Sequence, residues 1–404
     1  MHALLVGSGG REHALAWRLA SSPTLTDLHA APGNPGIAAL ATCHPVAADD
    51  SEGLLALAGS LSVDLVVVGP EAPLVAGVGD ALRHAGIAVF GPSAAAARIE
   101  GSKRFAKAVM SAAGVPTAAL LPAPRVPCVL KADGLAAGKG VVVCRTESEL
   151  TAGLDAARSF DGPVLVEELL EGPEASLFAL CDGVDAIALA PARDYKRAFD
   201  GDDGPNTGGM GSFAPTSDLD SEGADVLVET CVLPVLAELA DRGSPFVGTL
   251  FVGLMLTAEG PRVLEYNCRF GDPETQSVLP LVEGDFLAAL QAAAHGSVAN
   301  ADLASSGGAA VTVVLAAGRY PHAGDRGTPI HGVGDAERAG AHVFHAGTAL
   351  SDGQLVTNGG RLLGVTATGS TVADARDGAY AAADLIRIDG ARRRGDIAFD
   401  VGGV

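Results

Sequence analysis

Short apolar runs alternate with helical patterns through the first hundred residues of this 404-residue chain. The apolar runs lie at 3–6, 28–31, 64–68 and 87–90, and a helical pattern fills about 12–20. Parallel strands need long crossover connections, which are usually helices, so this order is typical of a parallel sheet covered by helices. We therefore predict the α/β fold class, with a parallel α/β domain over residues 1–100.

The region that follows, residues 101–296, contains every lysine of the chain and a long helical pattern from about 221 to 242. A chain of 404 residues exceeds what one hydrophobic core usually holds, so a second domain is expected here. Because its lysines accompany glycine-rich and acidic motifs, we interpret it as a nucleotide-binding domain.

The last hundred residues return to short strands. Apolar runs lie at 310–315 and 361–366, and a helical pattern follows near 373–386. We predict a small α+β domain over residues 305–404. Its basic run, Arg392-Arg393-Arg394, is interpreted as a solvated face or a helix end in preference to a binding patch.

Charge and composition exclude several classes of partner. The formal net charge is -21, whereas a nucleic-acid or anionic-membrane surface needs clustered basic residues. No apolar stretch approaches the ~20 residues that span a bilayer, and the sequence starts without a basic, cleavable leader. The six cysteines are far apart in apolar contexts, which indicates buried free thiols. We expect a cytoplasmic protein that binds neither nucleic acid nor membranes.

Lysine is rare, occurring only at Lys103, Lys107, Lys131, Lys139 and Lys196. The segment Lys131-Ala-Asp-Gly-Leu-Ala-Ala-Gly-Lys-Gly140 separates the apolar runs 128–130 and 141–143, which predicts a β-hairpin with a flexible loop. Backbone N–H groups and Lys139 can then cover a polyphosphate while Lys131 reaches it from its strand. The segment is not a Walker A motif, since Gly140 stands where Ser or Thr is needed and a strand follows. A solvated hairpin with incidental lysines is the alternative.

A glycine turn, Gly7-Ser8-Gly9-Gly10, joins the first strand to the first helix. It invites a dinucleotide-binding interpretation, but Glu12 falls where the third glycine of that fingerprint belongs. The second strand also ends at Gly33 without the carboxylate that would bind a ribose. A sugar phosphate could still bind the free N–H groups at the start of the helix. A tight turn required only for packing is the alternative.

Carboxylates follow the apolar run at 164–166. Glu167, Glu168 and Glu174 lie where a strand end could bind an adenine edge through its backbone and ribose hydroxyls through a carboxylate. Acidic strand ends are also often just solvated, so this signal is weak alone.

The segment Val263-Leu264-Glu265-Tyr266-Asn267 is more specific. Strand alternation places Glu265 and Asn267 on one face, and their oxygens are hard ligands of the kind that Mg²⁺ takes beside phosphates. Arg269, Asp272 and Glu274 follow at a predicted turn. A surface salt-bridge cluster is the alternative for these charges.

The segment Gly204-Pro-Asn-Thr-Gly-Gly-Met-Gly211, preceded by Asp202, is too rich in glycine for the interior of a helix or strand. We predict a loop that closes on a ligand. The alternative, a disordered linker, would seldom place a methionine between glycines.

Taken together, these segments resemble the ATP-grasp superfamily, and within it the glycinamide ribonucleotide synthetase (phosphoribosylamine–glycine ligase) family, over nearly the whole chain. The resemblance also rests on Val68-Gly69-Pro70-Glu71-Ala72-Pro73-Leu74, Glu100-Gly101-Ser102-Lys103 and His345-Ala346-Gly347-Thr348 with Thr357-Asn358-Gly359-Gly360-Arg361. It implies that residues 101–296 form an ATP-grasp domain and that the protein is a carboxylate–amine ligase of de novo purine biosynthesis. Glycine would be phosphorylated by ATP, and 5-phosphoribosylamine would capture the glycyl phosphate, giving glycinamide ribonucleotide, ADP and phosphate.

The resemblance further implies a role for each matching residue. ATP would be bound by Lys103, Lys131, Gly138, Lys139, Gly140, Glu167, Glu168, Leu170 and Glu174, with Glu167 to Leu170 at the adenine and Glu174 at the ribose. Mg²⁺, or Mn²⁺ in its place, would be bound by Glu265 and Asn267. The substrates would be bound by Gly9, Gly10, Arg11, Glu12, Asn206, Gly208, Gly209, Met210, Arg269, Gly271 and Asp272. Lys139, Arg269 and Asp202 would act in catalysis, and the enzyme is expected to be a monomer that binds small-molecule substrates.

Two departures from the family pattern are visible. The segment between Thr117 and Lys131 is short, so a helix usual in the family should be missing there. Arg193-Asp194-Tyr195-Lys196 replaces a commoner Gln-Asp-His-Lys, so Arg193 and Tyr195 receive no role. Two other functions stay open: an ATP-grasp ligase for a different carboxylate or amine, and a nucleotide-binding sensor without turnover.

Overall fold

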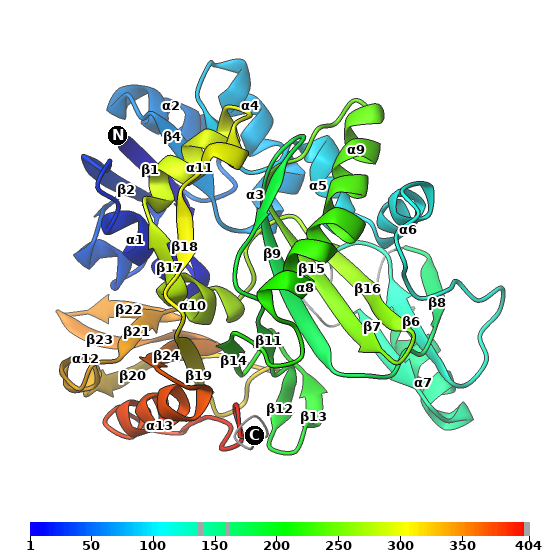
Figure 1. Ribbon diagram of the computed structural model, residues 1–404. Helices are drawn as coiled ribbons and strands as arrows, with labels where there is room; N and C mark the ends of the chain where they lie inside the picture. The colour runs from blue at the N-terminus through cyan, green and yellow to red at the C-terminus, as the bar shows by residue number, and fades with distance from the viewer. Residues whose placement is uncertain (136–139, 158–161, 400–404) are drawn as a thin grey trace.

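A computed structural model describes residues 1–135, 140–157 and 162–399. In Figure 1 the N-terminal part (blue) lies above the C-terminal part (orange to red), and the central part (cyan to green) lies beside both. Across these described ranges, no helix combines the length and apolar character needed to cross a membrane.

The N-terminal part is a five-stranded parallel sheet, as the sequence predicts. Its elements are β1 (His2–Gly7), α1 (Gly10–Ala20), β2 (Asp27–Pro32), β3 (Thr42–Cys43), α2 (Ser51–Leu61), β4 (Leu65–Val68), α3 (Glu71–Ala76), α4 (Val78–His84) and β5 (Val89–Phe90). The strand order is β3-β2-β1-β4-β5. Leu4 and Val66 enter one hydrophobic cluster, and Leu5 and Val67 enter another on the opposite face. Both faces of the sheet are therefore buried, as parallel sheets require.

The central part contains two antiparallel sheets. Its elements are α5 (Ala94–Gly101), α6 (Lys103–Ala112), β6 (Cys128–Ala132), β7 (Val141–Cys144), α7 (Glu147–Ala157), β8 (Val164–Glu168), β9 (Glu174–Asp182), β10 (Ala186–Ala188), α8 (Ser221–Leu227), α9 (Leu233–Asp241), β15 (Val247–Thr257) and β16 (Gly260–Asn267). The sheet orders are β7-β6-β8 and β10-β9-β15-β16. The predicted hairpin over the lysine loop is confirmed, because Lys131 pairs with Val141 across β6 and β7. No helix lies between α6 and β6, all of whose intervening residues are described, as the short segment predicts.

The helix predicted over 221–242 is interrupted. A π-helical turn, Val228–Val232, separates α8 from α9, and Pro234 stands in the first turn of α9. Proline has no N–H to continue the α-helical hydrogen bonds, so an irregular turn before it is expected.

The segment 193–214 leaves the central part and joins the C-terminal sheet. It contains β11 (Arg193–Asp194), β12 (Arg197–Phe199), β13 (Asp203–Asn206) and β14 (Gly211–Ala214). β12 and β13 form a hairpin, and β11 and β14 lie at one edge of the sheet β11-β14-β19-β24-β21. The prediction of one continuous loop over 204–211 is therefore wrong: its ends are strands, and 207–210 alone connects them. Gly209 is required there, since a Cβ at this position would lie 2.3 Å from Pro273 Cδ.

The remaining elements connect the parts and complete the C-terminal α+β domain, as the sequence predicts. They are α10 (Glu274–Val278), β17 (Val282–Gly284), α11 (Phe286–Ala294), β18 (Leu303–Ser305), β19 (Ala309–Ala317), β20 (Asp325–His331), α12 (Val333–Arg338), β21 (His342–His345), β22 (Thr348–Ser351), β23 (Gln354–Gly359), β24 (Arg361–Gly369), α13 (Val372–Ala383), β25 (Arg387–Ile388) and β26 (Ala391–Arg392). Helix α11 packs between the N-terminal sheet at β5 and the central sheet at β9 and β15.

The solvated-face interpretation of the basic run 392–394 is wrong for Arg394. Its side chain is 1% exposed and forms ion pairs with Asp202 (2.7 Å) and Asp396 (2.6 Å). The cysteine prediction is confirmed: all six thiols are free, and Cys43 is half-buried while the others are buried.

A buried pair of histidines joins the N-terminal and C-terminal parts. His13 Nδ1 accepts a hydrogen bond from the backbone N–H of His345 (2.7 Å), and His345 Nδ1 lies 3.0 Å from Thr348 Oγ1. Burial, aided by the neighbouring His345, lowers the pKa of His13 to about 3, and burial lowers the pKa of His345 to about 4. Both rings are therefore neutral in the folded protein at neutral pH.

We expect the free energy of unfolding to decrease as the pH is lowered from about 7 to about 5.5. The folded pKa values of the two histidines lie below their unfolded values near 6.5, so the unfolded chain takes up protons first, which costs up to ~1.4 kcal/mol per pH unit for each histidine. Urea unfolding at both pH values measures this. His345→Gln should lose less stability over the interval than the unsubstituted protein, and His322→Gln, at an exposed position, is the control. An equal loss in His345→Gln would contradict the interpretation.

Candidate active site

Arg269, two residues beyond the end of β16, holds three segments of the chain together. Its Nε donates to Glu71 at the start of α3 (3.3 Å), its Nη2 to Glu100 in α5 (3.0 Å) and its Nη1 to the carbonyl of Phe270 (3.2 Å). The side chain of Arg269 is 18% exposed and that of Glu100 is 8% exposed, so the surface salt-bridge alternative is wrong. Burial would lower the pKa of Arg269, but Glu100 and Glu71 outweigh this effect and raise it. The guanidinium is therefore a permanent charge of the site.

A β-bulge in β16 directs Glu265 and Asn267 to one face. The pairing with β15 shifts between Val263 and Glu265, which leaves Leu264 as the extra residue. Val263 and Tyr266 both enter the hydrophobic core, so Glu265 and Asn267, on either side of Tyr266, share the other face. Within the described part of the chain, the Glu265 carboxylate has no hydrogen bond or ion pair, and Asn267 Oδ1 has only a long contact of 3.5 Å from Arg269. Both oxygens are available to a ligand.

Lys107, Glu167 and Lys131 form a buried ionic triad. Glu167 Oε1 lies 3.1 Å from Lys107 Nζ, and Oε2 lies 2.8 Å from Lys131 Nζ. Lys107 also donates to Thr117 Oγ1 (2.8 Å) and Lys131 to the carbonyl of Leu264 (2.8 Å). Because Glu167 is only 2% exposed and binds both ammonium groups, an adenine contact could come only from its backbone.

A second ionic cluster surrounds Lys196, just after β11. Its Nζ lies 2.5 Å from Glu174 Oε2 and 3.9 Å from Asp194 Oδ1. Burial raises the pKa of Asp194 to about 7; Lys196 opposes this shift, and Glu274 and Glu174 add to it. Partial burial would lower the pKa of Lys196, but Asp194 and Glu174 outweigh it and raise the pKa. The ammonium of Lys196 is thus fixed among several carboxylates, one of which belongs to Glu174, the residue predicted to bind the ribose.

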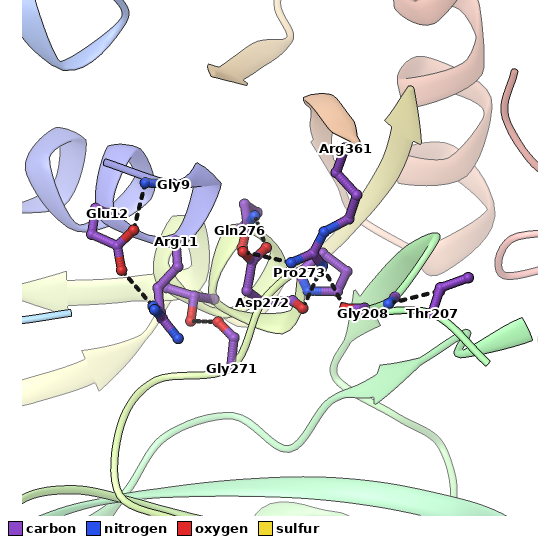
Figure 2. Close-up of polar contacts among 12 residues, drawn as sticks. Gly9, Arg11, Glu12, Thr207, Gly208, Gly271, Asp272, Pro273, Gln276 and Arg361 are labelled. Carbon is purple, nitrogen blue, oxygen red and sulfur yellow. Dashed lines mark hydrogen bonds and ion pairs between the residues drawn. The ribbon is translucent and has the colours of Figure 1, made fainter. Parts of the chain in front are cut away.

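A cavity of about 340 Å³ lies between the N-terminal and C-terminal parts. It is lined by the turn after β1, residues 33–34 just after β2, the segment 346–348, Asn358, Arg361 and Asp272. Both carboxylate oxygens of Asp272 are held: Arg361 Nη2 donates to Oδ2 (2.9 Å) and Gln276 Nε2 donates to Oδ1 (2.8 Å). Arg361 Nη1 also donates to the carbonyls of Asp272 (2.7 Å) and Gly208, as Figure 2 shows. The predicted substrate residues Gly208 and Asp272 are therefore bridged by one guanidinium.

Asn34 ties the walls of this cavity together. Its Nδ2 donates to the carbonyls of Ser8 and His345, both at 2.8 Å, and its Oδ1 accepts from the N–H groups of Gly36 and Ile37, both at 2.9 Å. One amide thus links the glycine turn, the end of β2 and the C-terminal part.

Glu12 explains why the glycine turn departs from the dinucleotide fingerprint. Its Oε2 accepts from the Gly9 N–H (2.6 Å) and its Oε1 from Arg11 Nε (2.6 Å), at the start of α1 (Figure 2). A Cβ at Gly7 or Gly69 would lie within 2.5 Å of the Glu12 side chain. The glycines therefore make room for a carboxylate of the protein's own helix. Arg11 also donates to the carbonyl of Phe270 (3.1 Å), so both side chains brace the turn.

Other predicted residues lie away from this centre or carry structural contacts. The Met210 side chain is 0% exposed and packs against Val314, Ala316 and Tyr320, so a substrate contact could come only from its backbone. Asp202 forms its ion pair with Arg394. Gly138 and Lys139 lie outside the described residues.

Several residues of the site were not predicted individually, namely Asn34, Glu71, Glu100, Lys107, Asp194 and Lys196. The rarity of lysine was a usable signal for Lys107 and Lys196. Glu71 and Glu100 lie in segments that carried the family resemblance. Asn34 had no signal, because its role depends on segments more than 300 residues apart.

Comparison with known proteins identifies matches along nearly the whole chain. Three domains of phosphoribosylglycinamide synthetase match: the N domain at residues 1–100, the ATP-grasp (A) domain at 101–275 and the C domain at 310–400. Phosphoribosylamine–glycine ligase of Streptomyces coelicolor is 49% identical over 422 residues, covering 100% of both chains. The Mesorhizobium japonicum enzyme of the same name is 48% identical over 405 residues, covering 96% of this chain and 95% of its own.

Solved structures give the same result at the level of the fold. The crystal structure of phosphoribosylamine–glycine ligase from Thermotoga maritima matches with a TM-score of 0.85 and 35% identity, covering 98% of this chain and 100% of that chain. The biotin carboxylase domain of 2-oxoglutarate carboxylase from Hydrogenobacter thermophilus matches with a TM-score of 0.68 and 17% identity over 96% of this chain and 91% of that chain. The second likeness shows a shared fold alone.

Replacing Arg269 with Met should lower the free energy of unfolding by about 3–5 kcal/mol, because Glu100 is then left buried without its partner. Urea denaturation measures this loss. The double variant Arg269→Met/Glu100→Gln should recover part of it, since the unpaired charge is removed. Arg262→Met is a matched control: Arg262 contacts the exposed Glu259 (2.8 Å), so it should cost less than about 1 kcal/mol. Equal losses for Arg269→Met and Arg262→Met would contradict the role of the buried contacts.

Proposed function

The chain belongs to the phosphoribosylglycinamide synthetase family, and on that basis we propose how its residues carry out the ligation reaction. The enzyme joins glycine to 5-phosphoribosylamine at the expense of ATP, giving glycinamide ribonucleotide, ADP and phosphate in purine biosynthesis. What remains to be assigned is the route of the reaction and the role of each side chain.

The route we propose passes through glycyl phosphate. A carboxylate is a poor acyl donor at neutral pH, so one oxygen of glycine first attacks the γ-phosphorus of ATP and the bond to the β-phosphate oxygen breaks. The amine of phosphoribosylamine then attacks the acyl carbon, phosphate leaves with that glycine oxygen, and the amine loses a proton. Neither step needs a nucleophile from the protein.

The phosphates of ATP are assigned to Lys103, Lys131 and Lys139. Lys131 is supported by its position on β6 directly before the glycine loop, and Lys103 by the bond from its Nζ to the carbonyl of Gly134 in that loop (2.9 Å). Lys139, which lies outside the described residues, is assigned to the γ-phosphate from the sequence alone. Glu174, fixed by Lys196, is assigned to the ribose.

The enzyme uses ATP with a divalent metal ion, and we assign Mg²⁺ to Glu265 and Asn267. The donor set fits: one carboxylate and one amide oxygen share a strand face, and the described residues include no group of three or more His, Cys, Asp or Glu that could hold a metal. Mg²⁺ takes few protein ligands and completes its shell with phosphate oxygens and water, whereas a dedicated cage would need more. When bound, the metal neutralises phosphate charge.

One observation supports the assignment of both steps, phosphoryl transfer and amine attack, to the same site. The segment 265–272 begins with the proposed metal ligands and ends at Asp272 in the cavity, with Arg269 between them. A glycine carboxylate near Arg269 would therefore lie between the phosphoryl donor and a substrate in the cavity. We assign the ribose phosphate of phosphoribosylamine to this cavity, where Arg361, Asn358 and the N-terminus of α1 supply polar and positive groups.

We propose a cytoplasmic, monomeric enzyme that acts on small-molecule substrates and has no nucleic-acid partner. The net charge of -21 supports the absence of nucleic-acid partners.

The reaction is tested by measuring ADP release from purified protein supplied with ATP, Mg²⁺, glycine and phosphoribosylamine, alone and together. We expect rapid ADP formation only when both substrates are present.

Glu265→Gln should reduce kcat at least about 100-fold, since a charged metal ligand is lost, while Glu259→Gln, on the exposed turn before β16, should leave kcat unchanged. ADP release with a different amine would favour another ligase, and tight ATP binding without release would favour a sensor.

A further inference from the structure

Residues 193–196 present two faces to their surroundings. Asp194 and Lys196 join the ionic cluster with Glu174, whereas Tyr195 is 4% exposed and packs with Phe213 in a separate hydrophobic cluster. This is the alternation of an extended chain, in which neighbouring side chains point to opposite sides. The ring of Tyr195 therefore anchors an extended segment, β11 and the two residues after it, whose other face carries Asp194 and Lys196.

The partner of Tyr195 is the C-terminal segment, residues 394–398. Its Oη accepts a hydrogen bond from the Ala398 N–H (3.0 Å), across 203 residues of sequence. Ile397 and Ala398 are 0% exposed and belong to the same hydrophobic cluster as Tyr195, although residues near chain ends are commonly mobile. Ala398 has a φ of 58°, a left-handed conformation that a residue with a Cβ keeps only when its surroundings impose it.

Arg394 reinforces this contact. Its guanidinium is held by Asp396 through two hydrogen bonds (2.7 and 2.6 Å) and by Asp202 (2.7 Å), and its Cζ lies 4.9 Å from the centre of the Tyr195 ring. Tyr195 thus contacts the C-terminal segment in two ways: its ring lies against the Arg394 guanidinium, and its hydroxyl accepts a hydrogen bond.

The backbone of Tyr195 links this anchor to the glycine-rich connection. Its N–H donates to the carbonyl of Gly211 (3.0 Å), and its carbonyl accepts from the Met210 N–H (2.8 Å). Lys196 then accepts at its own carbonyl from the N–H and Oγ1 of Thr207, both at 2.8 Å. A shift of Tyr195 would therefore move Lys196 and the segment 207–211 together.

We propose that Tyr195 is a positioning residue of the ATP site. The C-terminal segment holds Tyr195 from one side. On the other side Tyr195 fixes Asp194 and Lys196, and Lys196 in turn holds Glu174, which is assigned to the ribose. The proposal rests on the proposed function in that Glu174 and Lys196 are taken to belong to the ATP site. It gives the segment 394–398 a role in nucleotide binding although it follows the central part by about a hundred residues.

The direct test is the affinity of the full chain for a β,γ-methylene analogue of ATP with Mg²⁺, measured by titration calorimetry without the other substrates. Tyr195→Phe removes only the hydroxyl that accepts from the Ala398 N–H, and we expect its dissociation constant to rise about fivefold, an effect of the size of a lost hydrogen bond. Tyr380→Phe is the matched control, because Tyr380 Oη also binds the C-terminal segment, accepting from the Ile397 N–H (3.0 Å) and donating to the Arg394 carbonyl (2.9 Å). It should change the affinity less than about twofold. Equal weakening by both variants would show a general loss of stability and overturn the proposal.

A second measurement separates positioning from local packing. A chain that ends after Gly395 lacks Ala398 and should weaken analogue binding at least as much as Tyr195→Phe does, whereas a chain that ends after Phe399 keeps Ala398 and should bind more tightly than the shorter chain. Adding Tyr195→Phe to the shorter chain should weaken binding less than it does in the full chain, because the bond from the Ala398 N–H to the hydroxyl is already lost. Additive losses would overturn the proposal. Since analogue binding needs no ligation, these outcomes are independent of whether glycine and phosphoribosylamine are the substrates.

Discussion

The buried guanidinium of Arg269, shared between Glu71 and Glu100, is the interaction on which the rest of the site depends. These carboxylates belong to different helices, and separating Glu100 from Arg269 would leave a buried charge unpaired at a cost of several kcal/mol. The segment from β16 to α10 is therefore fixed against the N-terminal part. The proposed metal ligands precede Arg269 in this segment, and Asp272 follows it. The contacts of Arg269 therefore set the distance between the proposed phosphoryl-transfer site and the cavity assigned to the amine substrate.

The second constraint is the crossing of residues 193–214 into the C-terminal sheet. Strands β11 and β14 come from the central part of the sequence but pair along the edge of the sheet formed by β19, β24 and β21. Arg361 at the start of β24 then reaches Gly208 and Asp272. The three parts of the chain consequently share one site, where the proposed acyl phosphate would need protection from water.

The element types were predictable, but the contacts between them were not. The parallel sheet, the lysine hairpin and the C-terminal α+β domain follow from local patterns of apolar residues and glycine. By contrast, the bulge at Leu264 and the burial of Arg394 depend on partners far away in sequence, so no local pattern reveals them. The burial of the Met210 side chain was hidden for a related reason: a methionine between glycines indicates order, but not whether its side chain faces a ligand or a core. Glu12 shows the converse, because its mismatch to a dinucleotide fingerprint was read correctly and the structure supplies the reason.

The central claim is that both half-reactions take place at one centre through glycyl phosphate, and isotope transfer tests it most directly. Glycine labelled with ¹⁸O in its carboxylate is converted with ATP and phosphoribosylamine, and the inorganic phosphate is analysed by mass spectrometry. The account predicts one labelled oxygen in each phosphate released, because the oxygen that attacks phosphorus leaves with it. Unlabelled phosphate, or AMP in place of ADP among the products, would contradict the account.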